Sequence, residues 1–334
     1  MRAAVLRDPR PIEQSPLSIE NVTDPRPGQG EVLLRVRACG VCRSNLHMIE
    51  GDWMPQTPTH FPIIPGHEVV GEVLDIGDMV ANVALGDRVG VQPLWSTCGH
   101  CEHCLTGAEQ RCRNRQITGE HRDGGYAELM LANADFTVPI PDNVSDTEAA
   151  PLLCPGVTAY SSVKKAAISP GQRVGVVGIG GVGHVVVQLA ALTGAQVFAI
   201  SRDMSHRSLA LKLGAEDAFA PSYVEGNSLP DGTLDAVVVF APSAEAVAEA
   251  IRITKPGARI VLGVPQAIPA LDVGDEKVVL TSVLGTRWEM REVLRLASEG
   301  KVQVVHSDHP LADANEVLQG LKAGSVEARA VLVP

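Results

Sequence analysis

The spacing of apolar residues follows two different patterns in the two parts of the chain. Up to about residue 150, short alternating or β-branched runs such as EVLLRVRA (31–38) predict strands of a mostly antiparallel sheet. Farther on the spacing becomes helical, and RVGVVGIGGVGHVVVQLAALTGAQVFAIS (173–201) follows the order strand, glycine turn, helix, strand. We therefore predict an α/β protein with an antiparallel β domain over 1–150 and a doubly wound parallel-sheet domain over 151–287.

Two further helices and a strand follow the parallel-sheet pattern. The helices are predicted at REVLRLASEG (291–300) and ANEVLQGLKAG (314–324), and the strand at ARAVLVP (328–334). This pattern suits the first domain better than the second. We therefore expect 288–334 to return and complete the first domain, so that the parallel-sheet domain is an insertion.

Composition restricts the partners of the chain. With 39 acidic against 28 basic residues, the 334 residues carry a formal net charge of −11, which disfavours nucleic acid and anionic membranes and favours small molecules. No apolar run approaches the roughly 20 residues that span a bilayer, and the start, MRAAVLRDPRP, lacks the apolar core of a secretion signal. We therefore expect a cytoplasmic protein that does not bind membranes.

Four of the seven cysteines are gathered in one segment, CGHCEHCLTGAEQRC. They are Cys98, Cys101, Cys104 and Cys112. Thiolates at this spacing can close a tetrahedral shell around zinc, and such a shell stabilises a fold because it leaves no position for substrate. We predict a structural zinc lobe at about 95–113, with two disulfides or an iron–sulfur cluster as the alternatives.

A second, open metal site would have to be assembled from residues far apart. GVCRSNLH (40–47) combines a soft metal ligand, Cys42, with two proton carriers, and ordinary packing gives no reason for that combination. The other candidates are His67 and Glu68 in the GHE segment and the lone Cys154. Taken singly, each also fits a structural role, because a solitary cysteine or histidine is often buried without a ligand.

A glycine motif lies inside the predicted strand–helix–strand unit. Gly178, Gly180 and Gly183 form GxGxxG directly after a strand and at the start of a helix. In this context the motif indicates a dinucleotide-binding loop, with the pyrophosphate at the helix N-terminus. A structural glycine turn is the alternative.

Together these motifs resemble the medium-chain zinc-dependent alcohol dehydrogenase family over the whole chain. GHEVVGEVLDIGDMV carries the family's zinc signature, and the cysteine lobe, the glycine loop and ARAVLVP follow in the family's order. The signature positions are Gly66, His67, Glu68, Gly71, Gly77 and Val80. The resemblance implies a GroES-like catalytic domain, a Rossmann domain, and interconversion of an alcohol with its aldehyde or ketone using NAD or NADP. It also implies two zinc ions per chain and a homo-oligomer, either a dimer or a tetramer.

The resemblance assigns the open metal site. In this family the residues matching Cys42, His67 and Cys154 bind the catalytic zinc and leave a fourth position for water or substrate. Glu68 is implied either as an alternate ligand or as a support behind the ligands. Asn45 departs from the family, which commonly has Asp there, and an amide would orient a zinc-ligand histidine without adding charge.

A proton path is expected from the same segment. Ser44 is placed to take the proton from the alcohol, and His47, one helical turn further, to pass it toward solvent through the cofactor ribose. A plain surface histidine is the alternative for His47. By resemblance, Arg43 and Arg329 contact the pyrophosphate and Thr158 lies near the nicotinamide.

The substrate is poorly encoded. By resemblance, Trp53 and Trp95 lie in segments that line the substrate cleft, where two indoles would favour unhindered or flat substrates, although either could belong to the core. A primary alcohol and its aldehyde are the leading prediction, and secondary alcohols and polyols stay open. The rival functions are a polyol dehydrogenase or another zinc reductase of this fold, a non-catalytic zinc-stabilised nucleotide-binding regulator, and a zinc-ribbon interaction module.

Cofactor choice is predicted from FAISRDMSHR, at the end of the second strand of the nucleotide domain. An NAD enzyme usually has Asp or Glu there for the ribose 2′-hydroxyl, whereas this chain has Ser201. Arg202, His206 and Arg207 follow and could meet a 2′-phosphate, so we predict a preference for NADPH. Asp203 is the alternative ribose ligand, which would favour NADH.

Overall fold

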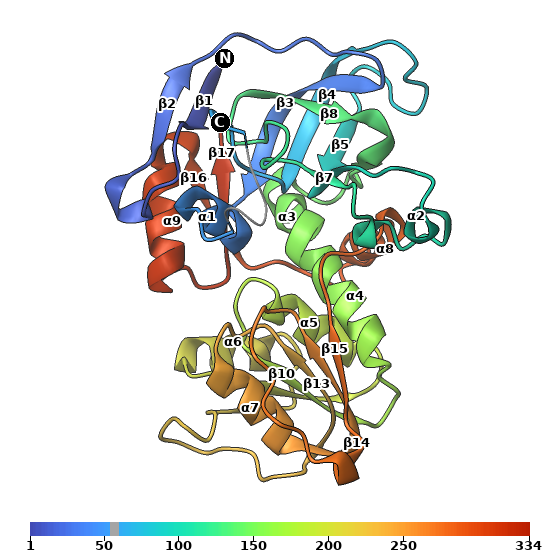
Figure 1. Cartoon of the computed structure of the whole chain (residues 1–334), viewed down its shortest axis with the longest axis vertical. Helices are drawn as coiled ribbons and strands as arrows, with labels where there is room; N and C mark the ends of the chain where they lie inside the picture. Colours follow the sequence, from blue (N-terminus) through green and yellow to red (C-terminus); the bar gives the residue numbers. More distant parts are fainter. Residues whose placement is uncertain (54–59) are drawn as a thin grey trace. The chain divides into compact units, whose positions relative to one another are not determined.

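The chain passes back and forth between two structural units (Figure 1). The structure is a computed structural model that describes residues 1–53 and 60–334. The first unit comprises Met1–Cys154, Thr286–Ser298 and Val305–Pro334, and the second comprises Pro155–Gly285 and Glu299–Val304. The metal-ligand candidates all lie in the first unit, and the glycine motif lies in the second.

A seven-stranded sheet forms the core of the first unit. Its order is β16-β17-β3-β4-β5-β9, with β8 also paired to β3. In β3 apolar and polar residues alternate, and so do the two faces on which they lie. Val32, Leu34 and Val36 are buried in the core, whereas Arg35 and Arg37 are exposed. These strands are β3 (Glu31–Gly40), β4 (Val69–Ile76), β5 (Arg88–Val91), β8 (Leu129–Asn133), β9 (Thr137–Pro139), β16 (His306–Pro310) and β17 (Arg329–Val333).

Short elements surround this sheet. Two-stranded ribbons are formed by β1 with β2 and by β6 with β7. The bounds are β1 (Arg2–Leu6), β2 (Leu17–Asn21), β6 (Leu94–Ser96), β7 (Gln116–Ile117), α1 (Arg43–Glu50), α2 (Glu102–Leu105), α3 (Asp146–Pro151), α8 (Arg287–Ser298) and α9 (Ala314–Ala323). Single turns occur at η1 (Ile12–Gln14), η2 (Glu109–Arg111), η3 (Ala134–Phe136), η4 (Leu152–Gly156, which crosses into the second unit) and η6 (Leu311–Asp313).

The second unit is built on a six-stranded parallel sheet of order β12-β11-β10-β13-β14-β15. The strand order reverses between β10 and β13, which makes the sheet doubly wound. The bounds are α4 (Val157–Ala166), β10 (Arg173–Val177), α5 (Gly183–Ala191), β11 (Gln196–Ile200), α6 (Met204–Lys212), β12 (Asp217–Phe219), β13 (Leu234–Val239), α7 (Ala244–Ile253), β14 (Thr254–Leu262), η5 (Val273–Asp275) and β15 (Val278–Thr281). The predicted combination of an antiparallel β unit with a doubly wound parallel sheet is confirmed.

The returning segment is divided between the two units, whereas the prediction took 288–334 as one piece of the first domain. Glu299–Val304 belongs to the second unit, because Val302 and Val304 are buried and Gln303 exchanges hydrogen bonds with the Gln188 side chain. Elsewhere, none of the helices in 1–53 and 60–334 combines the length and apolar character needed to cross a bilayer.

Candidate active site

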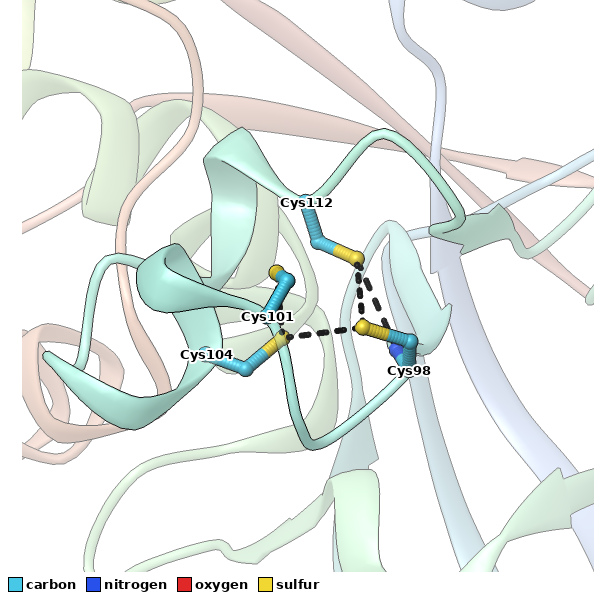
Figure 2. Close-up of side chains that lie close together, drawn as sticks. All are labelled: Cys98, Cys101, Cys104 and Cys112. Atoms are coloured by element: carbon cyan, nitrogen blue, oxygen red, sulfur yellow. Dashed lines mark hydrogen bonds between the residues drawn. The ribbon is translucent and has the colours of Figure 1, made fainter.

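The four clustered cysteines converge on one point in the lobe between β6 and β7 (Figure 2). Adjacent sulfur atoms are 3.5 Å apart for Cys101 and Cys104, 3.6 Å for Cys98 and Cys112, and 3.9 Å for Cys98 and Cys104. A tetrahedron with Zn–S bonds of about 2.3 Å has edges of about 3.8 Å. The four thiols therefore fit one zinc ion, and their separations are too long for disulfide bonds.

Local hydrogen bonds favour the thiolate form at two of the four cysteines. Backbone N–H groups of His100 and Cys101 lower the pKa of Cys98 to about 6, and the Thr97 hydroxyl lowers the pKa of Cys104. A backbone hydrogen bond from Cys104 also acts to lower the pKa of Cys101, but burial and the neighbouring thiols outweigh it and raise that pKa to about 11. Thiolates at neutral pH are the form that binds zinc.

The zinc lobe is tied to α8 by a pair that sequence reasoning missed. Glu109, buried in η2, accepts hydrogen bonds from the backbone N–H and the guanidinium of Arg287, the first residue of α8, at 2.9 to 3.0 Å. Arg287 also donates to the Asp135 carbonyl and lies over the Phe136 ring. A carboxylate at a helix N-terminus is favourable, so Glu109 joins the lobe to α8.

The second predicted metal set also comes together. Ligand atoms of Cys42, His67, Glu68 and Cys154 all lie within 4.8 Å of one another. Cys42 occupies the N-cap position of α1, two residues after the end of β3. His67 and Glu68 directly precede β4, and Cys154 lies in η4. The soft thiolate and imidazole donors fit the ligand chemistry of catalytic zinc.

Gly66 is required for the path of the chain into this cluster. Its φ is +104°, and a Cβ at this position would lie 2.5 Å from the Tyr126 ring and 2.9 Å from the Cys39 sulfur. Only glycine satisfies both constraints, so the backbone can bring His67 against Cys42.

Charge inside the cluster is shared between the ligands. A hydrogen bond from Cys154 holds the pKa of Cys42 well below its ordinary value, whereas the same contact and burial raise the pKa of Cys154 well above it. Burial acts to lower the pKa of His67, but contact with Cys42 outweighs it and the pKa is raised. The thiolate form of Cys42, which is the form that binds a metal cation, is thus favoured over that of Cys154.

Glu68 pairs with Arg329 at the back of the cluster. One guanidinium nitrogen, Nη2, lies 2.6 Å and 2.5 Å from the two carboxylate oxygens, and the exposed fractions are 0% for Glu68 and 5% for Arg329. Burial raises the pKa of the Glu68 carboxyl to about 7, although Arg329 opposes this. The structure thus places Arg329 on Glu68, and its contact with a pyrophosphate stays a prediction.

Asn45 is buried and reaches the other ring nitrogen of His67. Its side-chain nitrogen is 3.2 Å from His67 Nδ1, and the Tyr126 hydroxyl is 3.4 Å from its oxygen. A histidine that binds metal through Nε2 keeps its hydrogen on Nδ1, so the amide must then turn its oxygen to the ring. In that orientation Tyr126 accepts a hydrogen bond from the amide nitrogen.

The two predicted proton carriers have different surroundings. Ser44 Oγ lies 3.0 Å from the Cys42 sulfur and 3.3 Å from His67 Nε2, so it borders the ligand cluster. His47 is half-exposed, lies 2.7 Å from the Asp52 carboxylate through Nδ1, and stacks on Trp53 with ring centroids 5.5 Å apart. Sequence reasoning missed Asp52, although it is only five residues from His47.

The glycine motif of the second unit has the shape that a dinucleotide requires. Gly178 has a φ of +90°, and a Cβ there would lie 2.6 Å from the Ala241 nitrogen. A Cβ on Gly183, at the start of α5, would lie 1.8 Å from the Gly178 carbonyl oxygen. Gly180 has open space beside it, which leaves the helix N-terminus free for close approach by a phosphate.

In the segment after β11, the charged side chains of Asp203 and Arg207 make hydrogen bonds to neighbouring residues of the same segment. Asp203 is the N-cap of α6 and accepts from the Ser205 N–H at 2.7 Å. Arg207 donates through Nη1 to the carbonyls of Ser201 and Arg202. The Asp203 carboxylate is therefore directed to its own helix, and the contact of Arg207 with a 2′-phosphate stays a prediction.

The remaining predicted residues are distributed over both units. Arg43 donates to the Leu321 carbonyl at 3.0 Å. Thr158 is buried in α4. Trp95 is 6% exposed, which also suits the core alternative. The predicted roles of these residues toward cofactor and substrate stay predictions.

Comparison with known proteins agrees with this site. Residues 28–142 match the family model described as alcohol dehydrogenase GroES-like domain, and residues 181–299 match zinc-binding dehydrogenase. An alcohol dehydrogenase from Geobacillus stearothermophilus is 40% identical over 342 residues, covering 99% of each chain.

Solved structures are similar over the whole chain. The cobalt- and zinc-bound thermostable alcohol dehydrogenase from Pyrobaculum aerophilum is 32% identical with a TM-score of 0.89, covering 100% of this chain and 99% of that one. The acetophenone reductase from Geotrichum candidum in complex with NAD is 27% identical with a TM-score of 0.86, covering 100% and 97%. The chain therefore belongs to the medium-chain zinc-dependent alcohol dehydrogenase family and is an oxidoreductase that uses zinc and a nicotinamide cofactor.

Proposed function

We propose that this chain oxidises an alcohol, or reduces the matching aldehyde or ketone, at a catalytic zinc held by Cys42, His67 and Cys154. The observation that carries the proposal is the convergence of these three ligands within 4.8 Å, with the Ser44 hydroxyl on the same cluster. The four-cysteine lobe would hold a second, structural zinc. A primary alcohol and its aldehyde are the leading substrate pair, in a homo-oligomer.

The chain's own residues would hold the metal and move the proton. A bound zinc ion would supply Lewis-acid polarisation of the substrate oxygen, and a bound nicotinamide would supply the hydride chemistry. Ser44 Oγ accepts the alcohol proton, because it borders the ligands, and His47 passes it toward solvent. Among the described residues no direct hydrogen bond joins Ser44 and His47, so the proton would need one further hydroxyl or water between them.

Asp52 would be the residue that positions His47. Its carboxylate lies 2.7 Å from Nδ1 and would fix the hydrogen on that nitrogen, leaving Nε2 as the proton acceptor. Stacking on Trp53 restricts the ring further. This contact supports a relay role for His47 over a plain surface role.

A preference for NADPH is supported by the segment after β11. Ser201 stands where a carboxylate would repel a 2′-phosphate, and the Asp203 carboxylate caps α6 instead. Arg202 is exposed, so its guanidinium can meet the phosphate. A clearly higher kcat/KM with NADH than with NADPH would overturn this preference.

The function is tested by following nicotinamide absorbance with zinc-loaded protein and a panel of alcohols and aldehydes. We expect turnover with primary alcohols that is lost on replacement of Cys154. Absence of turnover with every alcohol and aldehyde, with either cofactor and full zinc content, would refute the proposed function.

A further inference from the structure

The hydroxyl of Tyr126 is buried behind the metal ligands and has no part in the reaction proposed above. Tyr126 and Asn45 are both 0% exposed, and His67 is 2% exposed. The Tyr126 hydroxyl lies 3.4 Å from the side-chain oxygen of Asn45, and the side-chain nitrogen of Asn45 lies 3.2 Å from His67 Nδ1. The three side chains therefore form one buried row that ends at a proposed zinc ligand.

Tyr126 is fixed to the segment that precedes His67. Its N–H donates to the Pro65 carbonyl at 2.9 Å, and the N–H of Gly125 donates to the Gly66 carbonyl at 3.0 Å. The Tyr126 ring occupies the space where a Cβ on Gly66 would lie, because that atom would be 2.5 Å from ring atom Cδ1. The backbone of the ligand segment thus sets the position of the hydroxyl.

Asn45 belongs to the other ligand segment. It lies in the first turn of α1, and its N–H donates to the Cys42 carbonyl at 3.1 Å. A hydrogen bond between Asn45 and Tyr126 therefore joins the segment of Cys42 to the segment of His67.

The two ends of the Asn45 amide are not equivalent. His67 turns Nε2 toward the ligand cluster, where it lies 3.3 Å from Ser44 Oγ. A histidine that binds metal through Nε2 carries its hydrogen on Nδ1, so an acceptor oxygen must face that side of the ring. The amide nitrogen then points away from the ring, toward Tyr126, and a buried N–H without an acceptor is costly. A carboxylate at position 45 would have no such requirement, since either of its oxygen atoms can face the ring.

We propose that Tyr126 is a positioning residue for the catalytic zinc: its hydroxyl accepts a hydrogen bond from the Asn45 amide nitrogen and so holds the amide oxygen on His67 Nδ1. This inference rests on the proposed function, which it deepens by naming the residue that allows an amide to support the zinc-binding histidine. Tyr126 should therefore affect zinc binding only while residue 45 is an amide.

The test combines Tyr126→Phe with Asn45→Asp and measures the zinc dissociation constant of the catalytic site by competition with a chelator. Cys154→Ala, which should keep only the lobe zinc, gives the baseline. In the wild-type background we expect Tyr126→Phe to raise this constant about tenfold, as is usual when a group that supports a metal ligand is lost. In the Asn45→Asp background the same change should raise it no more than about twofold. Tyr223→Phe, a change of the same kind in the second unit, is the matched control.

A spectroscopic measurement on the wild type does not depend on whether the variants fold. In nitrogen NMR spectra of the zinc-loaded protein, the His67 side chain should carry its hydrogen on Nδ1 and bind the metal through Nε2. A hydrogen on Nε2 with the metal on Nδ1 would overturn the proposal, because the Asn45 oxygen would then have no hydrogen to accept from the ring.

The variants separate a positioning role from a packing role. Equal losses of zinc affinity in the two backgrounds would mean that Tyr126 only supports packing, and would overturn the proposal. An unchanged dissociation constant in Tyr126→Phe would overturn it as well. Wild type that binds no zinc beyond the lobe ion would refute the proposed function together with this inference, whereas a full second zinc that does not depend on Tyr126 refutes the inference alone.

Discussion

Breaking the Glu68–Arg329 pair should destabilise the first unit much more than breaking an exposed pair. Both side chains are buried, at 0% and 5% exposure, and Arg329 Nε has no other partner in the described chain. At about pH 8.5, above the pKa of about 7 given for Glu68, the substitution Glu68→Gln removes a negative charge and leaves the guanidinium buried. The variant keeps the size of the side chain, so packing changes little.

The expected magnitude follows from burial. Removing one partner of a buried ion pair costs about 3–5 kcal/mol, because the other charge stays without compensation. Because Cys42 and Cys154 also attract Arg329, part of the compensation remains in the variant. We therefore expect a loss of unfolding free energy at the lower end of this range, about 3 kcal/mol. The exposed pair of Arg2 with Glu128, at 57% and 35% side-chain exposure, should contribute no more than about 1 kcal/mol.

Urea unfolding of zinc-loaded protein, followed by circular dichroism, measures this difference. A loss of about 3 kcal/mol should lower the midpoint by roughly 1 M urea. Glu128→Gln is the matched control, and zinc content is measured for each variant. The combined Glu68→Gln, Arg329→Met protein should recover part of the loss, because no unpaired charge remains.

Two results would contradict this reasoning. A loss in Glu68→Gln no larger than in Glu128→Gln would mean that water or another group compensates Arg329. Strictly additive losses in the double variant would mean that the two side chains do not depend on each other.

Three further predictions concern the metals, the proton and the nucleotide. Cys154→Ala should remove one of the two proposed zinc ions and abolish turnover with a modest loss of stability, whereas Cys101→Ala should remove the other and mainly lower the melting temperature; elemental analysis and thermal unfolding measure both. His47→Gln should slow alcohol oxidation most below neutral pH, where solvent accepts protons poorly, and added imidazole should restore part of the rate. Arg202→Ala should raise the KM for NADPH about tenfold or more and barely change the KM for NADH, since only NADPH carries the 2′-phosphate.

Each of these has an outcome that counts against it. One zinc ion or none in carefully prepared wild type would contradict the two-metal proposal. An unchanged pH profile in His47→Gln would assign His47 to the surface role. The proposed contact between Arg202 and the 2′-phosphate would be refuted if Arg202→Ala raised the KM values for NADPH and NADH equally. It would also be refuted if Lys212→Ala, at the other end of α6, had the same effect as Arg202→Ala.

Local sequence patterns were enough to predict the fold class, but they predicted only part of the candidate site. Alternation and the glycine motif are properties of neighbouring residues, so they predicted the sheets of both units. Glu68 and Arg329 are 261 residues apart, and Glu109 and Arg287 are 178 apart, so no local pattern could pair them. Glu109 was missed because an isolated acidic residue in a short polar segment is usually solvated, and only the fold buries it.

The position of β17 has a consequence for biosynthesis. This strand lies inside the sheet between β16 and β3, and it carries Arg329 to Glu68. On the ribosome, the first 154 residues therefore emerge without one interior strand and without the cation that neutralises a buried carboxylate. Nearly all residues of the parallel-sheet unit, Pro155–Gly285, are synthesised before β17, so this unit can fold while synthesis continues. The zinc-binding unit, although it is synthesised first, reaches its final form last, so zinc is held by a completed site only after Arg329–Val333 has left the ribosome.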